Sequence, residues 1–482
     1  MQTATPISAT SLSWDDLPGP RGWPLVGNAF QIDRDHMHRR LEDWAARYGS
    51  PFKFRIGKGR FLVVSDPEAI GKVLRDRPDG FRRPGRLEKI SREFGFLGLF
   101  SANGETWKRQ RPMVLGGFDP AHIKAFFPTL AGVTERLARR WQRAAERGEN
   151  IDLQGDLMRY TVDVTAALAF GEDINTLDAR EGESVIQTHL NHVLPALVRR
   201  ALAPFEYWKY LPTRKERELK VHLAAIHVAV QSFIAKTRRK LDEQPQLREK
   251  PANLIQAMIA VRDRGQGLSD EDVSGNVLTM LLAGEETTAN TLAWMFWLLH
   301  GNPQARQRAA DEARAALQGE VCPVRFEQLS QLEWIEACAN EAMRLKPVAP
   351  LIFTQALRST AIDGVQVERN DVVVCLMRGG AMDAAHFPDP AEFRPERWLR
   401  GEGAAAHSMA SAKRVAMPFG AGPRMCPGRY LALAEIKMAA AMLLANFDIR
   451  SVDTRDGKEP VEEIALTMYP VGLRMRLAPS GT

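Results

Sequence analysis

The stretch that decides the fold is FGAGPRMCPG, residues 419–428, which places one cysteine among three glycines and two prolines. The glycines remove side-chain bulk and the prolines fix the path of the backbone, so a flat ligand can approach closely. A helical pattern resumes at Arg429, which puts Cys426 just before a helix N-terminus, where the helix dipole favours a thiolate. A lone cysteine is more often an inert buried side chain, and the surrounding loop is what points to a function.

The composition indicates a soluble globular protein. Of the 482 residues, 45% are hydrophobic and 26% are charged. The net charge of +6 is spread in short groups, without the dense basic run and exposed aromatics that nucleic-acid binding favours. The four cysteines stand singly, so no disulfide framework is indicated and a reducing, cytoplasmic location is expected. Residues 1–16 lack the features of a signal peptide or membrane anchor, and we expect a flexible tail there.

The longest helical pattern extends from Ser269 to Gly301. Ser269 and Asp272 have the spacing of a capping box, which marks the start of the helix. Glu285 and Glu286 in its middle argue against a membrane span, because each buried carboxylate costs about 2.5 to 3.5 kcal/mol on insertion. We therefore expect a core helix that crosses the middle of the protein.

The remaining pattern is helical over residues 66–345, with few strand candidates. Outside the long helix, the expected elements are a hairpin at 52–66, a helix from Phe326 to Lys346, short strands at 350–377 and a sheet-like tail at 463–478. No internal repeat or flexible linker divides the chain. The sequence therefore predicts a mainly α fold with a minor β part, as a single catalytic domain over residues 17–482.

The cysteine loop resembles the haem-ligand loop of the cytochrome P450 family, FxxGxRxCxG, through Phe419, Gly422, Arg424, Cys426 and Gly428. The resemblance implies the cytochrome P450 fold, with the long helix crossing haem b and Cys426 as the axial thiolate ligand of its iron. Arg424 would pair with a haem propionate, Phe419 would pack beside the sulfur, and Gly420 belongs to the same cofactor-binding bend. A thiolate ligand favours O–O cleavage, which indicates oxygen activation.

A second motif of the family is ExxR, present here as Glu341 and Arg344 in NEAMRL. The simplest interpretation of this pair is a solvated surface ion pair, which contributes only about 0.2 to 0.5 kcal/mol. In the family the motif is followed by a PERF/W segment, and this chain has FRPERW with Arg397 in the matching place. The resemblance implies a structural network of Glu341, Arg344 and Arg397 that retains the cofactor and takes no part in the chemistry.

A third motif is WxxxR, present as Trp107 and Arg111 on one face of an expected helix. A half-buried tryptophan on an amphipathic helix is the commoner case, whereas in the family both residues donate to a haem propionate. One departure stands out: many relatives read HRDP before FPDP, and this chain has GGAMDAAHFPDP, which retains only Asp383. The resemblance therefore does not supply the propionate contact that the missing His or Arg often makes.

The long helix carries AGEETT, residues 283–288, near its middle. An acid and an alcohol inside a buried helix are costly, which usually marks a function or a hidden partner. The family motif AGx(D/E)T(T/S) lies over the distal haem face and contains a glycine bulge. The resemblance makes Glu286 and Thr287 the acid-alcohol pair that delivers protons, and Ala283 and Gly284 the lining of the oxygen groove. Glu285 has no role in the pattern and is expected to face outward.

Together the motifs resemble a haem-thiolate monooxygenase of the soluble bacterial type, which inserts one atom of O2 into a lipophilic substrate by hydroxylation or epoxidation. The chain ends soon after the final sheet, so we expect electrons from NAD(P)H to arrive through a separate ferredoxin or flavodoxin with its reductase. The expected docking face is basic and includes Lys108, Arg109 and Arg429. We expect a monomer, without a nucleic-acid partner or a membrane anchor.

Substrate contacts are placed by analogy in apolar segments, where the alternative is ordinary core packing. They are Phe94, Phe96, Leu97 and Phe100 in the loop 83–103, the region from the 190s to the 210s, Leu281, Leu351 to Phe353, and Met468 to Tyr469. A terpenoid, steroid, fatty acid or hydrophobic natural-product intermediate is favoured over an amino acid.

Other functions remain open from sequence. A peroxide-driven peroxygenase, a haem-thiolate isomerase, and a haem sensor or electron carrier could all use the fold, but none needs the acid-alcohol pair. A zinc or disulfide role for the cysteines is the last alternative.

Overall fold

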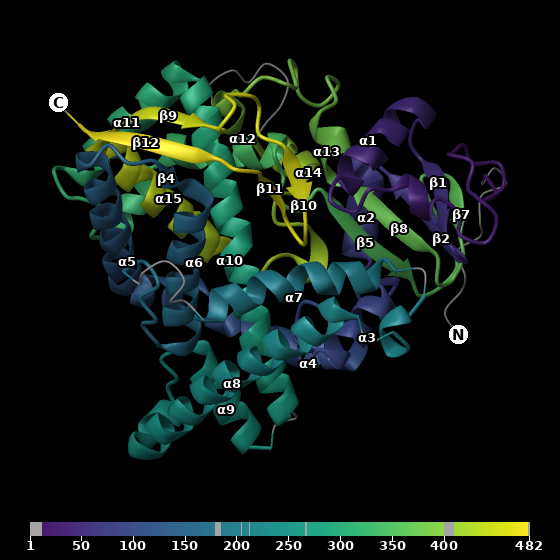
Figure 1. Ribbon diagram of the computed structural model, residues 1–482, viewed down its shortest axis with the longest axis horizontal. Coiled ribbons are helices and arrows are strands. Elements are labelled where there is room, and N and C mark those ends of the chain that lie inside the picture. The colour runs from purple at the N-terminus through teal and green to yellow at the C-terminus, as the bar shows by residue number, and fades with distance from the viewer. Residues whose placement is uncertain are drawn as a thin grey trace.

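The computed structural model describes residues 12–178, 185–203, 205–211, 213–265, 268–399 and 409–480. Helices make up one side of the molecule and a five-stranded sheet lies at the other end (Figure 1). The long helix α10, Asp270–Gly301, runs through the middle. The structure is thus mainly α with a minor β part, as the sequence predicts.

The other helices are α1 Met37–Tyr48, α2 Pro67–Arg75, α3 Gly85–Glu93, α4 Gly104–Gly117, α5 Pro120–Glu146, α6 Leu153–Phe170, α7 Val185–Ala201, α8 Arg214–Glu243, α9 Leu254–Asp263, α11 Pro303–Leu317, α12 Glu333–Leu345, α13 Met377–Ala381, α14 Met409–Ala416 and α15 Arg429–Asn446. Short 3-10 helices are η1 Ala29–Gln31, η2 Tyr207–Lys209, η3 Pro245–Arg248, η4 Phe326–Gln331, η5 Pro395–Trp398 and η6 Gly422–Arg424. The strands are β1 Phe52–Ile56, β2 Gly59–Val64, β3 Phe81–Arg82, β4 Ile151–Asp152, β5 Leu351–Ala356, β6 Thr360–Ile362, β7 Val365–Val367, β8 Val372–Leu376, β9 Phe447–Asp453, β10 Glu462–Ile464, β11 Met468–Pro470 and β12 Arg474–Pro479.

Helix α10 begins where the sequence predicts. Ser269 Oγ accepts from the Asp272 N–H at 3.1 Å, and the Asp272 carboxylate accepts from the Ser269 N–H at 3.0 Å, which completes the capping box. The helix packs against α6, α8, α9, α11, α12 and α15, so neighbours cover most of its length. It is therefore the expected core helix, buried because apolar side chains occupy nearly all of its faces. Among the described helices, none combines the length and the apolar run that crossing a bilayer requires.

The larger sheet has the strand order β1-β2-β8-β5-β3. Strands β1 and β2 form the expected hairpin, with Ile56 opposite Gly59 and a positive φ of 57° at Gly57. The C-terminal segment supplies the expected sheet-like tail, because β12 pairs with β9 and β10 pairs with β11. The β10–β11 hairpin also contacts α10 through β11, and so brings the end of the chain to the central helix.

Two boundaries differ from expectation. The helix expected from Phe326 to Lys346 is divided at Leu332 into η4 and α12, because the Glu312 carboxylate of α11 accepts the N–H groups of Trp334 and Ile335 at 2.7 and 2.9 Å. These bonds cap a new helix, so the single-helix prediction is wrong. At the N-terminus, residues 1–11 of the expected tail lie outside the described residues, whereas Trp14 is buried with the Arg60 guanidinium 4.3 Å from its ring. The packed chain therefore begins before residue 17.

Candidate active site

The cysteine loop is held rigidly against the body of the protein. Gly420 and Gly422 adopt positive φ of 72° and 70°, a region that other residues rarely occupy. A Cβ on Gly422 would lie 2.5 Å from the Leu74 carbonyl oxygen at the end of α2, so only glycine fits. The Cys426 N–H donates to the Phe419 carbonyl at 3.0 Å, which closes the loop just before α15. The backbone therefore fixes the position of the sulfur.

The environment of Cys426 differs from that of the other three cysteines. Burial raises the pKa of the Cys426 thiol, while the Gly428 N–H and the charges of Arg111 and Arg429 oppose the rise. Cys322 and Cys375 are fully buried, and burial raises their pKa to about 12. All four thiols are free. Cys426 is the half-buried thiol with cationic neighbours, which suits a thiolate that binds a metal.

Four arginines gather beside the cysteine loop: Arg77, Arg83, Arg111 and Arg424. Loss of hydration and mutual repulsion lower the pKa of Arg83 to about 9 and that of Arg424 to about 10, and burial lowers that of Arg77 to about 10. In the described chain, no carboxylate lies within ion-pair distance of any of the four. Their hydrogen bonds go to carbonyl and amide oxygens, such as Ala102 O at 2.7 Å from Arg424 Nη2.

This arginine cluster fits an anionic cofactor. The Nε atoms of Arg83, Arg111 and Arg424 are buried without a hydrogen-bond partner among the described residues. Leaving cations buried and unpaired is costly, so the arrangement indicates a bound anion with several acceptor oxygens. The two carboxylates of haem meet that requirement. Trp107 lies in the same place, with the Arg424 guanidinium stacked 4.7 Å from its ring centre.

A stretch of α10 presents an accessible face in an otherwise buried helix. Ala283 is exposed and Gly284 and Thr287 are half-buried, whereas the residues around them are buried. The helix is continuous here, so the glycine bulge implied by the resemblance is absent. The reason for Gly284 is a close approach of α6, since a Cβ would lie 2.2 Å from Thr165 Oγ1. Ala283 and Thr287, one turn apart, thus leave one side of the helix accessible to a ligand, while Gly284 allows α6 to pack closely on another side.

The acid and the alcohol of this helix have separate partners. Thr287 Oγ1 donates to the Ala283 carbonyl at 2.9 Å, and Glu286 Oε2 accepts from Thr467 Oγ1 at 2.8 Å. Burial raises the pKa of Glu286, and the Thr467 hydrogen bond opposes that rise. Glu285 is buried, which contradicts the expectation that it faces outward. Helix α6 covers this turn, as shown by the bond from Thr161 Oγ1 to the Glu285 carbonyl at 2.8 Å.

The ExxR pair lies in the core rather than on the surface. Glu341 and Arg344 are both 0% exposed in their side chains and form a bidentate ion pair with two bonds of 2.8 Å. Arg397 Nε reaches Glu341 Oε1 at 3.3 Å, and Trp398 Nε1 donates to Oε2 at 2.8 Å. Arg344 also donates to the carbonyls of Ala381, Pro390 and Glu392. The three residues singled out from the sequence thus meet in one buried network.

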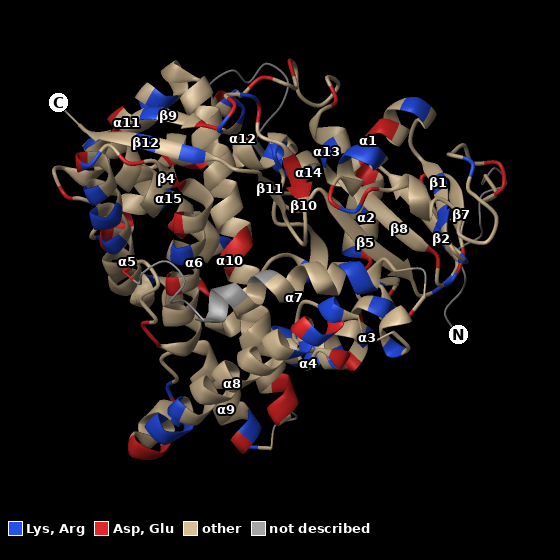
Figure 2. Cartoon of the chain, in the orientation of Figure 1, with Lys and Arg blue, Asp and Glu red and all other residues tan. Residues whose placement is uncertain are grey.

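The expected docking residues are mostly engaged with carboxylates. Lys108 donates to Glu105 at 3.1 Å and Arg109 pairs with Asp272 at 3.2 Å. Arg429 donates to the Tyr430 hydroxyl at 2.9 Å. Figure 2 shows basic and acidic residues interspersed over the face in view.

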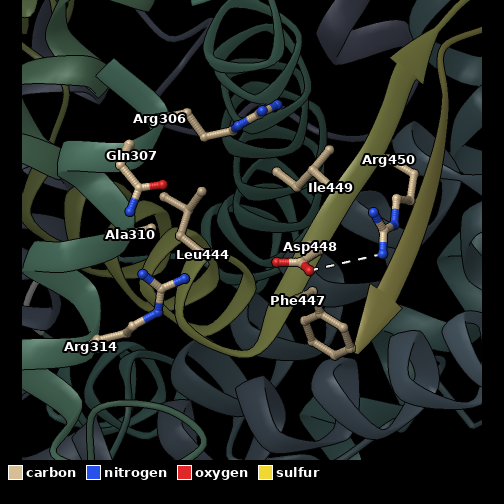
Figure 3. A pocket seen from close by; sticks show the side chains of 9 residues that line it. All are labelled: Arg306, Gln307, Ala310, Arg314, Leu444, Phe447, Asp448, Ile449 and Arg450. Carbon is tan, nitrogen blue, oxygen red and sulfur yellow. Dashed lines mark ion pairs between the residues drawn. The ribbon is translucent and has the colours of Figure 1, made fainter. Parts of the chain in front are cut away.

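A surface pocket of about 230 Å³ opens elsewhere, between α11, the end of α15 and β9 (Figure 3). Arg306, Arg314 and Arg450 line it, and Arg450 pairs with Asp448 at 4.0 Å. The pocket lies at the C-terminal end of α15, whereas Cys426 precedes the N-terminal end. A helix of 18 residues is about 27 Å long, so this pocket is separate from the cysteine site.

The free Cys426 thiol with its cationic neighbours and the unpaired arginines beside it fit a class of protein that binds an anionic cofactor next to a cysteine sulfur. Comparison with known proteins agrees with this class. The family model described as "Cytochrome P450" matches residues 17–475, and the chain belongs to the cytochrome P450 family.

Several relatives resemble the chain over most of its length. A "Putative cytochrome P450 CYP13A3" of Caenorhabditis elegans is 26% identical, over 96% of this chain and 94% of that protein. "Cytochrome P450 86B1" of Arabidopsis thaliana is 26% identical, over 93% of this chain and 83% of its own length. The "Bifunctional cytochrome P450/NADPH--P450 reductase ascE" of Acremonium egyptiacum is 28% identical, but the match covers only 42% of that protein. Family membership makes the protein an oxidoreductase of the monooxygenase type that uses haem, O2 and electrons derived from NAD(P)H.

Sequence reasoning missed three residues of this region. Arg77 and Arg83 join the predicted Arg111 and Arg424, but arginine is common on surfaces and nothing in RDRPDGFRRP, residues 75–84, marks either of them as buried. Thr467 reaches Glu286 across 181 positions of the chain, a contact that only the β10–β11 turn creates. The sole available signal was the expected sheet-like tail.

Proposed function

We propose that the protein is a haem-thiolate monooxygenase that hydroxylates or epoxidises a lipophilic substrate. The observation that best supports this function is the position of Cys426. It lies between the N-terminus of α15 and a cluster of arginines that have no carboxylate partner among the described residues. In the overall reaction a substrate RH, O2, two electrons and two protons give ROH and water. When bound, haem supplies the oxygen-activating redox chemistry, and the chain supplies the ligand, the protons and the pocket.

The residues around the cofactor have distinct roles in this proposal. Cys426 would bind the iron, and the arginine cluster with Trp107 would hold the propionates. Phe419 and Gly420 shape the bend around the sulfur, and the Glu341, Arg344 and Arg397 network supports it from behind. Arg83 is suited to the propionate contact that the GGAMDAAHF segment lacks, because its Nε is buried without a hydrogen-bond partner beside Arg77 and Arg424, where an anion would relieve the unpaired charge.

The two protons that the reaction consumes would reach O2 through Glu286 and Thr287. Glu286 is buried, and burial raises the pKa of its carboxyl, which favours the proton-holding form that a proton donor needs. Thr287 lies on the accessible face of α10 beside Ala283 and Gly284 and offers a hydroxyl to an oxygen bound there. A peroxygenase or an isomerase has no need of such a pair, which favours the monooxygenase.

The lipophilic class of substrate is supported by half-buried apolar side chains. They are Leu97, Phe100, Leu351, Ile352, Phe353 and Tyr469. Phe94, Phe96, Leu281 and Met468 are buried in the core instead. Phe100 lies beneath the Arg83 guanidinium at 4.2 Å, so the apolar surface begins next to the cofactor site. A terpenoid, steroid, fatty acid or similar hydrophobic intermediate suits this lining.

The electron donor would be a separate ferredoxin or flavodoxin with its reductase. Arg429 at the start of α15 and Arg111 lie next to Cys426 and supply positive charge on that side, which favours an acidic partner.

The test uses purified holoprotein with a ferredoxin, its reductase and NADPH. A panel of lipophilic compounds is screened for shifts of the haem absorption, and hits are incubated with isotope-labelled O2. We expect one labelled oxygen in the product. Thr287→Ala should lower product formed per electron pair, with Thr237→Ala, a buried threonine of α8, as the control. Unchanged product yield in Thr287→Ala would refute the monooxygenase mechanism.

A further inference from the structure

A series of hydrogen bonds connects Glu286 with the surface of α6. Gln154 Nε2 donates to Asn290 Oδ1 at 2.8 Å, and Asn290 Nδ2 donates to Thr467 Oγ1 at 3.1 Å. The Thr467 hydroxyl in turn donates to Glu286 Oε2 at 2.8 Å. Asn290 and Thr467 are buried and Gln154 is half-buried. Nothing in the proposed function uses these three polar residues.

The arrangement fixes the direction of the Thr467 hydroxyl. Glu286 and Asn290 stand one turn apart on α10, so they share a side of the helix, and Thr467 enters between them from the turn joining β10 and β11. The Asn290 amide nitrogen can only donate, so it occupies a lone pair of Thr467 Oγ1. The hydroxyl hydrogen is left for Glu286. The Glu286 carboxyl is thus held by a Thr467 hydroxyl whose direction is fixed by Asn290.

We propose that Thr467 is a positioning residue that holds Glu286 in a resting state, away from Thr287. In the described structure the two side chains of the acid-alcohol pair are bonded to other groups, Glu286 to Thr467 and Thr287 to its own helix. Delivery of a proton to Thr287 then requires Glu286 to exchange partners, and the Asn290–Thr467 pair sets the resting position to which the acid returns. This inference rests on the proposed role of Glu286 and Thr287.

The first test reads the Glu286 carboxyl directly, without turnover. The infrared C=O stretch of protonated Glu286 is identified in haem-loaded protein by its loss in Glu286→Gln. Thr467→Val removes the hydroxyl at constant shape, so we expect the band to move to higher frequency and to persist to higher pH. Thr467→Ser should restore both. A band that does not change in Thr467→Val overturns the proposal.

The pH shift has a defined sign. Thr467 donates to the carboxylate and so favours its charged form, which means that losing the hydroxyl raises the pKa of Glu286 further. The titratable groups on the surrounding elements are Glu285 on α10, Glu435 on α15, and Tyr469 on β11 with its hydrogen-bonded partner Glu463. None of these is altered in the Thr467 variants, so the shift reports the lost hydrogen bond.

The second test follows the electrons, with dodecanoic acid as the probe substrate and a ferredoxin system as donor. Electrons that do not form product reduce O2 by two electrons and two protons to hydrogen peroxide. One hydrogen bond changes a population about fivefold. Thr467→Val frees Glu286 to reach Thr287, so it should lower the peroxide share of electrons by up to about that factor. Thr467→Ser should restore the wild-type share, and Thr237→Val, a buried threonine bonded only within α8, should not change it.

The outcomes separate this inference from the proposed function. If Glu286→Gln raises the peroxide share and Thr467→Val leaves it unchanged, the positioning role is refuted while the acid-alcohol pair stands. If neither Glu286→Gln nor Thr287→Ala changes it, the proposed function itself fails. Equal haem content and melting temperature in the Thr467 variants show that a change does not come from misfolding.

Discussion

Glu435 predicts an unusual pH dependence of stability. This carboxyl is buried in α15 and hydrogen-bonds Thr288 of α10, and burial raises its pKa to about 8. Because the folded state keeps the proton, stability is full below the unfolded pKa of about 4.3 and is lost as the pH rises towards 8. At about 1.36 kcal/mol per pKa unit, the loss between pH 5 and pH 8 amounts to roughly 3 to 4 kcal/mol.

Glu435→Gln should remove this loss, since the amide resembles the protonated acid and does not titrate. Unfolding entropy is about 2.1 cal/mol/K per residue, so for a chain of 482 residues each kcal/mol corresponds to roughly 1 °C. The melting temperature of the variant relative to wild type should therefore rise by about 3 to 4 °C between pH 5 and pH 8. Glu320→Gln, at an exposed position, is the control. Its melting temperature relative to wild type should not change between pH 5 and pH 8. If the melting temperature of Glu435→Gln relative to wild type also stays constant between pH 5 and pH 8, Glu435 does not cause the loss of stability.

Three further substitutions test the cofactor site. Glu341→Gln leaves Arg344 buried without its charge partner, and should lower the free energy of unfolding by about 3 to 5 kcal/mol, measured by denaturant titration. Gly284→Ala should lower the melting temperature, because its Cβ would lie 2.2 Å from Thr165 Oγ1, and Thr165→Ala in the same protein should recover most of the loss. Arg83→Gln should weaken haem retention at least about tenfold in a haem-transfer assay, as expected for one charge-assisted hydrogen bond. Unchanged haem transfer in that variant would exclude Arg83 from the propionate site.

Local signals in the sequence were sufficient for the main elements of the fold. Ser269 and Asp272 mark the start of α10 because a capping box acts within four residues, and Gly57 marks the β1–β2 turn for a similar reason. The break at Leu332 could not be predicted, since its cause is the Glu312 carboxylate on another helix. Elements set by their own residues were therefore recoverable, and boundaries set by a neighbour were not.

The candidate site divides in the same way. Cys426 and Arg424 stand in one short loop with its own pattern, so the sequence singles them out. Glu285 was misplaced because the side of α10 that α6 covers depends on packing. Thr467 lies in the turn between β10 and β11, whereas its partner Glu286 lies on α10, and their contact depends on where the β10–β11 hairpin packs against that helix. Long-range contacts of this kind leave no local trace in the sequence.

Because the arginine cluster needs an anionic partner, we expect assembly of the protein to depend on the supply of haem. Before haem arrives, a newly made chain must crowd Arg77, Arg83, Arg111 and Arg424 together without counter-charges, and we expect the segment from the end of α2 to the start of α4 to open readily in that state. Protease digestion of haem-starved cells should therefore cut this segment first, and adding a haem precursor to the culture should protect it. The yield of intact chain would then report haem availability during synthesis.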